Sequence, residues 1–357
     1  MSEGNEVRKR LIWIDLSKGV GIVLVILAHS TVIEPSLPTI FISNFAIALF
    51  FFLGGLTYSS ERYRNNLRYF IVSRGKQFLI PYFALYIIIM ILFVPLASNV
   101  DTYLTPDQLL FWFLYGSGPP NQATHLWFLP VLYFGLVLFV LIDRAMHRFP
   151  HEARWILVVL LPAIGVAIRD YFFPVLVPWR VSSILVATAF CIIGHEVSRY
   201  RGLKSWTTGS KGRDLVLFIV CFVIVLLVSN YNWLVDFAVD RLGTFPLLYL
   251  VSGTFGTIMV FILCSTFEDS ENASRIILPF GTDSQTIYEI HPVFFYIVPP
   301  LLVLLGWSAA DIAANHVLLW PLRFIPGVVL SLLFAVYIVS KSDAMSFIFT
   351  GKRAPKK

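Results

Sequence analysis

The sequence predicts an all-α integral membrane protein, a polytopic bundle of about ten transmembrane helices with both termini in the cytoplasm. Composition, the lengths of the apolar runs and the placement of Lys and Arg each support this fold class. Hydrophobic residues make up 57% of the 357 residues, charged residues make up 13%, and the mean hydropathy is +0.78. These values lie outside the range of soluble domains, so the lipid bilayer is the expected solvent and partner.

Apolar runs of spanning length recur along the chain. A transmembrane helix needs about 20 mostly apolar residues. The runs that approach this length are 11–33, 39–58, 77–98, 125–142, 154–169, 174–197, 214–231, 246–266, 286–306 and 317–340. The fifth run is the weakest because it is short and contains Pro162. We expect each run to form one transmembrane helix.

The distribution of Lys and Arg supports this count. If the N-terminus is inside, 22 of the 27 Lys and Arg residues fall in cytoplasmic segments and only 4 in the outer connections or helix ends. Cytoplasmic loops of membrane proteins collect these residues, and one miscounted helix in the middle would destroy the asymmetry. We therefore predict a cytoplasmic tail at 1–10, one transmembrane domain at 11–340 and a basic cytoplasmic tail at 341–357.

The net charge and the cysteines require no further partner. Basic loops explain the net charge of +6, so no nucleic-acid partner is expected. Cys191, Cys221 and Cys264 lie far apart inside apolar runs and form no CxxC pair. We interpret them as small buried hydrophobic residues and expect neither a disulfide nor a metal site.

The first run carries three ionisable residues, Asp15, Lys18 and His29. Charged side chains in a span cost about 2.5–3.5 kcal/mol on insertion scales. Lys18 and His29 are eleven residues apart, so at about 100° per residue they lie within about 20° of one face, roughly 16 Å apart along the helix. An interfacial ion pair with a boundary histidine explains this stripe, and so does a functional site.

Other histidines lie near the ends of predicted spans. His125 begins the fourth run at the predicted membrane level of His29, and His291 lies near the start of the ninth. His195 and Glu196 end the sixth run, where a solvated helix end explains them as well as a function does. Because other histidines also flank spans beside similar groups, they weigh against a purely interfacial role for the polar stripe of the first run.

Together these residues resemble acyltransferase family 3, integral membrane acyltransferases that include the fucose 4-O-acetylase-like sugar acetylases. Lys18 and His29 have the spacing of that family's Arg-x10-His signature. Further similar elements, in the same order as in the family, are 15–22, 74–82, 125–129 and 284–291. Two positions depart from the pattern: Lys18 stands where Arg is frequent, and Gln77 replaces the second Arg of an Arg-x-x-Arg element.

The resemblance implies transfer of an acyl group, most often acetyl from cytoplasmic acetyl-CoA, to a sugar hydroxyl of a cell-envelope or exported polysaccharide. It implies a multi-pass protein of the bacterial inner (plasma) membrane with no permanently bound cofactor. Acetyl-CoA is then the donor, a glycan or lipid-linked sugar is the acceptor, and envelope-glycan assembly proteins are further candidate partners. Whether the acyl group passes directly or through an intermediate stays open.

Candidate roles follow for nine residues. An imidazole is the usual base for activating an alcohol, so His29 is the candidate base, with Asp15 and His125 as further catalytic candidates. Candidates for binding CoA phosphates are Lys18, Arg74 and Lys76. Candidates for binding the sugar are Trp127, Glu289 and His291. Positive-inside anchoring explains Arg74 and Lys76 equally well, and an interfacial aromatic belt explains Trp127.

Two other classes of protein remain open on the sequence. A transporter or flippase for a glycan or small polar solute would use intramembrane Asp, Lys and His as a proton relay or substrate path. No convincing internal repeat between the two halves of the chain favours that class. A non-catalytic membrane partner of a glycan-assembly complex is the third alternative.

Overall fold

Residues 11–31, 36–96, 105–117, 124–296, 298–315 and 318–354 are described by the computed structural model. The predicted N-terminal tail at 1–10 lies outside these residues. In the described part, the strands are β1 (Val235–Asp236) and β2 (Arg241–Leu242), which pair antiparallel, and helices make up nearly all the rest. The all-α membrane architecture predicted from the sequence is therefore present.

Nine helical segments of the described chain are long and apolar enough to cross a membrane. They are built from α1 (Ile12–Ser30), α2 (Leu37–Ser43) with α3 (Ala46–Leu56), α5 (Leu67–Leu96), η1 (Thr124–Trp127) with α7 (Phe128–Ala145), α8 (Glu152–Phe172), η2 (Pro178–Arg180) with α9 (Val181–Arg201), α10 (Lys211–Asn232), α11 (Pro246–Thr266), and α16 (Trp320–Tyr337) with η4 (Val339–Lys341). The remaining elements are α4 (Ser60–Tyr63), α6 (Pro106–Tyr115), η3 (Phe237–Val239), α12 (Glu271–Thr282), α13 (Ser284–Tyr296), α14 (Val298–Leu304), α15 (Ala309–Ala314) and α17 (Asp343–Thr350).

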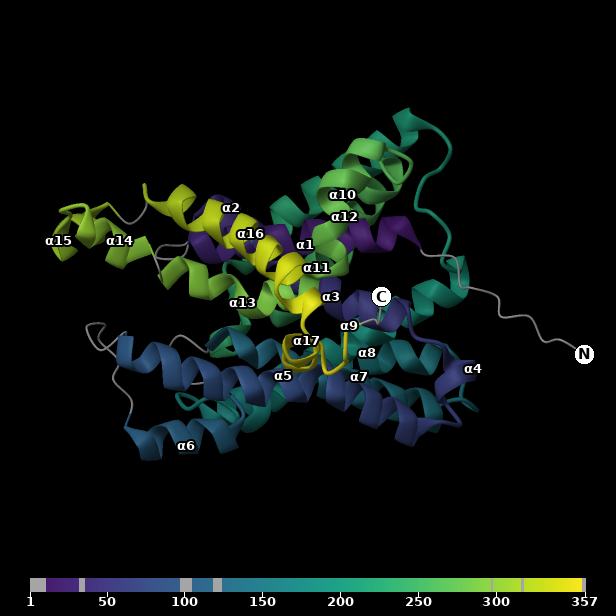
Figure 1. Cartoon of the computed structure of the whole chain (residues 1–357). Coiled ribbons are helices and arrows are strands. Elements are labelled where there is room, and N and C mark those ends of the chain that lie inside the picture. The colour runs from purple at the N-terminus through teal and green to yellow at the C-terminus, as the bar shows by residue number, and fades with distance from the viewer. Residues whose placement is uncertain are drawn as a thin grey trace, which may run out of the picture.

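The ninth predicted span, 286–306, falls on the helices α13 and α14, which lie on either side of position 297. Position 297 itself is outside the described residues. Pro292 lies inside α13, where membrane helices tolerate proline. In Figure 1, α14 continues outward from α13, and α16 returns beside α13.

Small residues allow the central helices to approach closely. α1 packs against α3, α11, α12, α13 and α16, which makes it a central element of the bundle. A Cβ at Gly281 would collide with the backbone oxygen of Asp15, and a Cβ at Gly55 would collide with the backbone of Cys191. These contacts bring the end of α12 against α1 and press α3 against α9, as small residues do between membrane helices.

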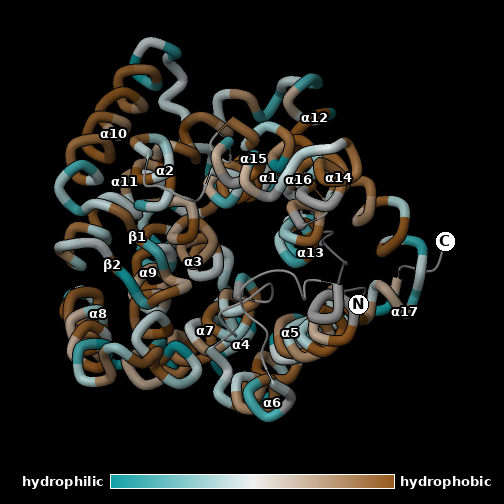
Figure 2. Tube along the Cα trace, turned by 90° about the vertical axis from the view of Figure 1, so that its left-hand side faces the viewer, coloured by the Kyte–Doolittle hydropathy of each residue, from teal (hydrophilic) through white to brown (hydrophobic). Residues whose placement is uncertain are grey.

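The outer helices present apolar side chains. Figure 2 looks along the bundle, so that the long helices are seen nearly end-on, and brown residues cover much of α8 and α10 at its edge. Ile156 of α8 and Leu215 of α10 are examples of large exposed apolar residues. In contrast, most residues of α3 and α9 are buried. The exposed apolar surfaces are those that a bilayer would cover.

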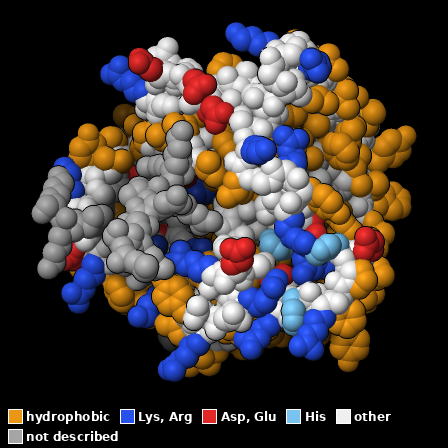
Figure 3. Space-filling view, turned by 90° about the vertical axis from the view of Figure 1, so that its right-hand side faces the viewer, with side chains coloured by type: hydrophobic (Ala, Val, Ile, Leu, Met, Phe, Trp, Pro, Cys, Tyr) orange, Lys and Arg blue, Asp and Glu red, His pale blue; other side chains and the backbone are white. Residues whose placement is uncertain are grey.

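Positively charged residues gather on one side, which we call the basic side and define as the side where α1 begins at Ile12. Figure 3 views this side, with Lys and Arg side chains spread over it. The predicted C-terminal tail at 341–357 includes part of η4 and the helix α17, which packs against α5. The backbone of Gly351 approaches the backbone of Lys76 at this contact.

Candidate active site

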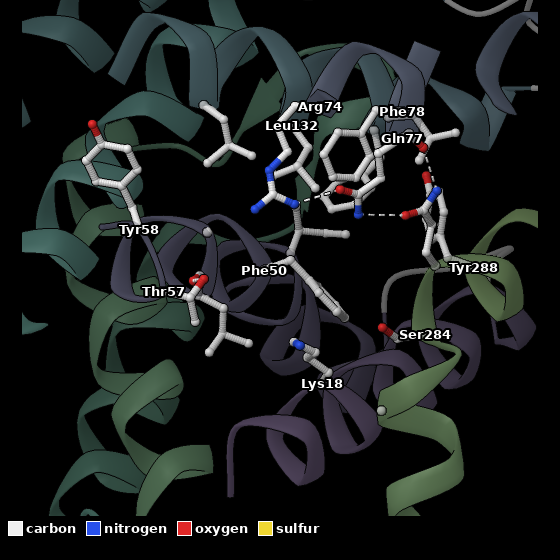
Figure 4. Close-up of a pocket in the computed structure, with 18 of the residues that line it drawn as sticks. Lys18, Phe50, Thr57, Tyr58, Arg74, Gln77, Phe78, Leu132, Ser284 and Tyr288 are labelled. Atoms are coloured by element: carbon white, nitrogen blue, oxygen red, sulfur yellow. Dashed lines mark hydrogen bonds between the residues drawn. The ribbon is translucent and has the colours of Figure 1, made fainter. Parts of the chain in front are cut away.

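A cavity of about 360 Å³ opens between α1, α3, α5, α7 and the start of α13. We call it the Lys18 cavity. Its polar lining residues are Lys18, Thr57, Tyr58, Tyr63, Arg74, Gln77, Thr282, Ser284, Gln285 and Tyr288. In Figure 4, Lys18 and Arg74 approach this cavity from opposite walls. Two cationic side chains therefore face one space, which suits an anionic ligand.

Asp15 and Lys18 form the ion pair expected from their spacing. The Lys18 Nζ atom lies 3.1 Å from Oδ1 of Asp15. Asp15 precedes His29 by 14 residues, or about 21 Å along the helix, so it does not contact the imidazole. Its carboxylate instead orients the ammonium group of Lys18 at the cavity wall.

Arg74 is held by a chain of amide side chains. It donates a 2.6 Å hydrogen bond to Gln77 Oε1, and Gln77 Nε2 in turn donates to Gln285 Oε1 at 3.2 Å. Gln285 also donates to Glu289 Oε1 at 3.0 Å. Gln77, which replaces a family arginine, thus positions Arg74 at the cavity while lining that cavity itself.

Lys76 and Glu289 lie outside both cavity linings. The Lys76 side chain is exposed and is not among the residues that line the Lys18 cavity. Glu289 is 1% exposed, and its Oε2 atom has no hydrogen-bond partner among the described residues. Its Oε1 atom accepts a hydrogen bond from Gln285 on the same helix, α13, so its position does not favour direct binding of a substrate in either cavity.

A second cavity, of about 260 Å³, lies toward the opposite side of the bundle. We call it the His29 cavity. Its polar and aromatic lining residues are His29, Thr39, Ser43, Trp127, Asp236, Phe237 and Tyr288. Val25, Ile47 and Tyr288 line both cavities, so the two spaces are separated by little more than these shared side chains.

His29 forms a hydrogen-bonded pair with His291. The His29 Nδ1 and His291 Nε2 atoms are 2.8 Å apart, and the ring planes differ by only 11°. A separation of 2.8 Å is too short for face-to-face ring contact, so the hydrogen bond lies close to both ring planes. His29 is exposed into its cavity, whereas His291 is fully buried and lines neither cavity.

His125 lies beyond His291 as seen from the His29 cavity. Its ring centre is 6.0 Å from that of His291, and its Nε2 atom donates a 3.0 Å hydrogen bond to the backbone oxygen of Glu289. The Tyr288 hydroxyl donates to the backbone oxygen of His125. His125 therefore fixes η1 against α13 and approaches His29 through His291, the residue between them.

Trp127 lines the His29 cavity as part of an aromatic wall. Its ring is parallel to that of Phe237, with 5.5 Å between ring centres and 7° between the planes. The segment that carries Phe237 is held by buried Arg180, whose guanidinium donates to the backbone oxygens of Phe237 and Ala238 at 3.2 and 2.6 Å. A flat aromatic wall suits an acceptor with apolar faces.

Asp236 adds a carboxylate to the same wall. Its Oδ1 atom accepts a hydrogen bond from the Ala238 N–H at 2.9 Å. Burial raises the pKa of this carboxyl above its usual range. Asp236 and Phe237 were not among the residues expected from the sequence, where an acidic residue in a short loop gives no sign that the loop folds over a cavity.

A buried ionic cluster is the other feature that sequence reasoning missed. Arg154, the first residue of the fifth apolar run, is 4% exposed and donates to Glu196 Oε1 at 2.6 Å and to Asp143 Oδ1 at 3.0 Å. His195 and Glu196, for which a solvated helix end and a function explained the sequence equally well, are 5% and 1% exposed. The sequence does show acidic residues at the ends of spans. Only the packing of α7, α8 and α9 brings them together with Arg154.

The architecture and this arrangement of side chains define a polytopic membrane protein with a buried histidine pair beside two adjoining cavities. The family described as "Acyltransferase domain", acyltransferase family 3, matches residues 11–340. The chain therefore belongs to that family and is a membrane acyltransferase. No curated protein and no solved structure matches the chain.

Proposed function

We propose that the protein is an O-acetyltransferase that moves acetyl from acetyl-CoA to a sugar hydroxyl of a cell-envelope or exported polysaccharide. The observation that carries the proposal is the position of His29, an exposed imidazole on the wall of one cavity that adjoins a second, cationic cavity. A base between a donor space and an acceptor space is what acyl transfer to an alcohol requires.

The Lys18 cavity is the proposed donor site. CoA carries phosphates, and Lys18 and Arg74 supply positive charge from opposite walls of this cavity. The acyl-bearing end of the donor then reaches toward Val25 and Tyr288, which line both cavities. This adjacency favours direct transfer within the bundle over a covalent acyl intermediate.

The His29 cavity is the proposed acceptor site. Trp127 and Phe237 offer apolar faces, while Asp236 offers a hydrogen-bond acceptor for sugar hydroxyls. This mixture of an aromatic surface and a few polar groups is typical of small-molecule sites. A glycan or lipid-linked sugar would place one hydroxyl against His29.

The reaction needs one base and no permanently bound cofactor. A ring nitrogen of His29 takes the proton of the acceptor hydroxyl as its oxygen attacks the thioester carbonyl carbon. The new C–O bond forms, the C–S bond then breaks, and the CoA thiolate recovers the proton from the imidazolium. His29 returns to its neutral form, with the ester and free CoA as products.

The proposed topology has ten crossings, with both termini in the cytoplasm of a bacterial inner membrane. The nine spanning segments together with the pair α13 and α14 support that count. The basic side would then face the cytoplasm, where acetyl-CoA is available. A reporter fused at residue 357 should lie in the cytoplasm, and a reporter within 237–240 should lie in the opposite compartment. Both reporters in the same compartment would contradict ten crossings.

The first experiment is transfer of labelled acetyl from acetyl-CoA to envelope glycan in membranes carrying wild type or His29→Ala. Base-labile label should appear with wild type only, at equal protein abundance. His147→Ala is the matched control, because His147 is an exposed histidine outside both cavity linings. Absence of label with wild type across several glycan pools and acyl donors would contradict the proposal and favour a transporter.

A further inference from the structure

We propose that His291 is a positioning residue that fixes the tautomer of His29, so that the lone pair of His29 Nε2 serves as the base. This inference rests on the proposed acyl transfer and assigns His291 a role other than binding the sugar. It follows from the hydrogen bonds of the histidine pair, taken in order from the backbone outward.

The backbone determines which nitrogen of His291 carries hydrogen. His291 Nδ1 lies 2.7 Å from the backbone oxygen of Tyr288 and 3.3 Å from that of Ile287. A carbonyl oxygen can only accept, so Nδ1 must be the N–H donor. In a neutral imidazole the other nitrogen, Nε2, is then an acceptor.

Burial keeps His291 neutral. Its side chain is fully buried, and its hydrogen-bond partners among the described residues are two backbone oxygens and another imidazole. The ring of Phe295 packs edge-on at 5.5 Å. A charged imidazolium in such surroundings would be poorly solvated and would have no carboxylate to stabilise it. Neutral His291 therefore presents only an acceptor to His29.

His29 must supply the hydrogen of the bond between the two rings. Because His291 Nε2 accepts, the 2.8 Å contact requires an N–H at Nδ1 of His29. Neutral His29 is then left with its lone pair on Nε2, which has no hydrogen-bond partner among the described residues. Since the His29 ring lines its cavity, this nitrogen is the one available to an acceptor hydroxyl.

The same contact assists when His29 becomes charged. After proton transfer, both nitrogens of His29 are donors, and Nδ1 still donates to His291 Nε2. The arrangement is the one by which a second group orients a catalytic imidazole in hydrolytic triads, where loss of the correct tautomer costs about 10⁴-fold in turnover. Here a neutral histidine tied to a backbone carbonyl takes the place of a carboxylate.

Two substitutions distinguish the role of the His291 hydrogen bond from the role of the volume that its side chain fills. His291→Gln keeps an acceptor oxygen within reach of His29 Nδ1, whereas His291→Leu removes it. We expect His291→Leu to lower kcat by about 100-fold or more, with KM for acetyl-CoA nearly unchanged, and His291→Gln to recover much of that loss. Phe295→Leu is the packing control, because the Phe295 ring packs edge-on against the His291 ring and has no hydrogen-bonding group, and it should retain kcat.

A double-mutant cycle tests whether His291 acts through His29. In a His29→Ala background, His291→Leu should cause no further loss of residual transfer. An equal loss in both backgrounds, or wild-type kcat in His291→Leu at normal abundance, would overturn the inference.

Ring ¹⁵N spectra of purified protein with labelled histidines test the tautomer without any substrate, and His29→Ala assigns the signal. Wild type should show neutral His29 with hydrogen on Nδ1, and His291→Leu should lose that preference. Hydrogen on Nε2 in wild type would overturn the inference even if transfer is observed. Conversely, the predicted tautomer without any acyl transfer would count against the proposed function alone.

Discussion

Two buried polar groups of this protein differ in their partners and in what they border. Around Arg154, one guanidinium bridges Asp143 and Glu196, and Arg64 approaches Asp143 at 3.4 Å from the solvent side. Around His29, two imidazoles share one hydrogen bond, and no carboxylate contacts either ring among the described residues. The first group is an ionic cluster closed by helices, whereas the second borders a cavity.

The difference separates the roles of the two groups. Arg154 and its partners lie outside both cavity linings, and their ion pairs join α7, α8 and α9. His29 keeps a ring exposed to a cavity large enough for a ligand. In a membrane both kinds of group are costly, and the group that borders a cavity is the one whose hydrogen-bonding capacity a ligand can reach.

Arg154→Met should give the largest effect on stability. It leaves Asp143 and Glu196 buried without their bridging cation, and breaking a buried ion pair in this way typically costs about 3–5 kcal/mol. We expect reduced abundance and a lower thermal unfolding temperature in detergent. The triple variant with Asp143→Asn and Glu196→Gln should recover part of the loss, because it removes the uncompensated charges.

Activity per folded molecule distinguishes a structural role of the Arg154 cluster from a catalytic one. Folded Arg154→Met should retain kcat, since the cluster lies outside both cavity linings. A selective loss of kcat with unchanged unfolding temperature would instead assign the cluster to catalysis.

Arg74→Ala should weaken the donor site. A charge-assisted hydrogen bond contributes about 1.5–3 kcal/mol, so KM for acetyl-CoA should rise about 10- to 100-fold while the unfolding temperature changes little. Lys76→Ala is the matched control, because Lys76 is exposed and close in sequence but does not line the cavity. Equal KM values for the two variants would return Arg74 to an anchoring role.

Much of the fold could be predicted because its signals are local. Run lengths and the Lys and Arg distribution identified the regions of all nine spanning segments found in the described chain. The ninth predicted span falls on α13 and α14, where position 297 lies outside the described residues. Whether α13 and α14 together cross the bilayer stays a prediction.

The candidate site was predictable only where one helix carries it. The spacing of Lys18 and His29 follows from helix geometry, and the structure places them in two different cavities. The pairing of His29 with His291, 262 residues apart, depends on how α1 packs against α13. No local pattern specifies that contact, nor the fold of the loop that brings Asp236 to the cavity.

Trp127→Leu should weaken the acceptor site by a smaller amount. The substitution removes the ring that is parallel to Phe237 on the cavity wall, and an aromatic contact of this kind contributes about 0.5–1.5 kcal/mol beyond its buried area. We expect KM for the glycan to rise several-fold, with KM for acetyl-CoA unchanged. The reverse pattern, with the donor KM affected, would exchange the proposed roles of the two cavities.

Asp236→Asn should have the smallest effect on KM for the glycan at neutral pH, and its main effect should be on the pH dependence of that KM. Burial raises the pKa of Asp236, so the carboxylate present at neutral pH takes up a proton at a higher pH than an ordinary aspartate would. As a carboxylate it accepts hydrogen bonds from sugar hydroxyls, and protonation removes part of that capacity. KM for the glycan in wild type should therefore rise as the pH falls toward this raised pKa.

In Asp236→Asn, glycan KM should be modestly higher at neutral pH and should lack that rise. Protonation of His29 should lower kcat in both proteins. An identical pH dependence of glycan KM in the two proteins would remove Asp236 from the acceptor site and leave the aromatic wall as its main feature.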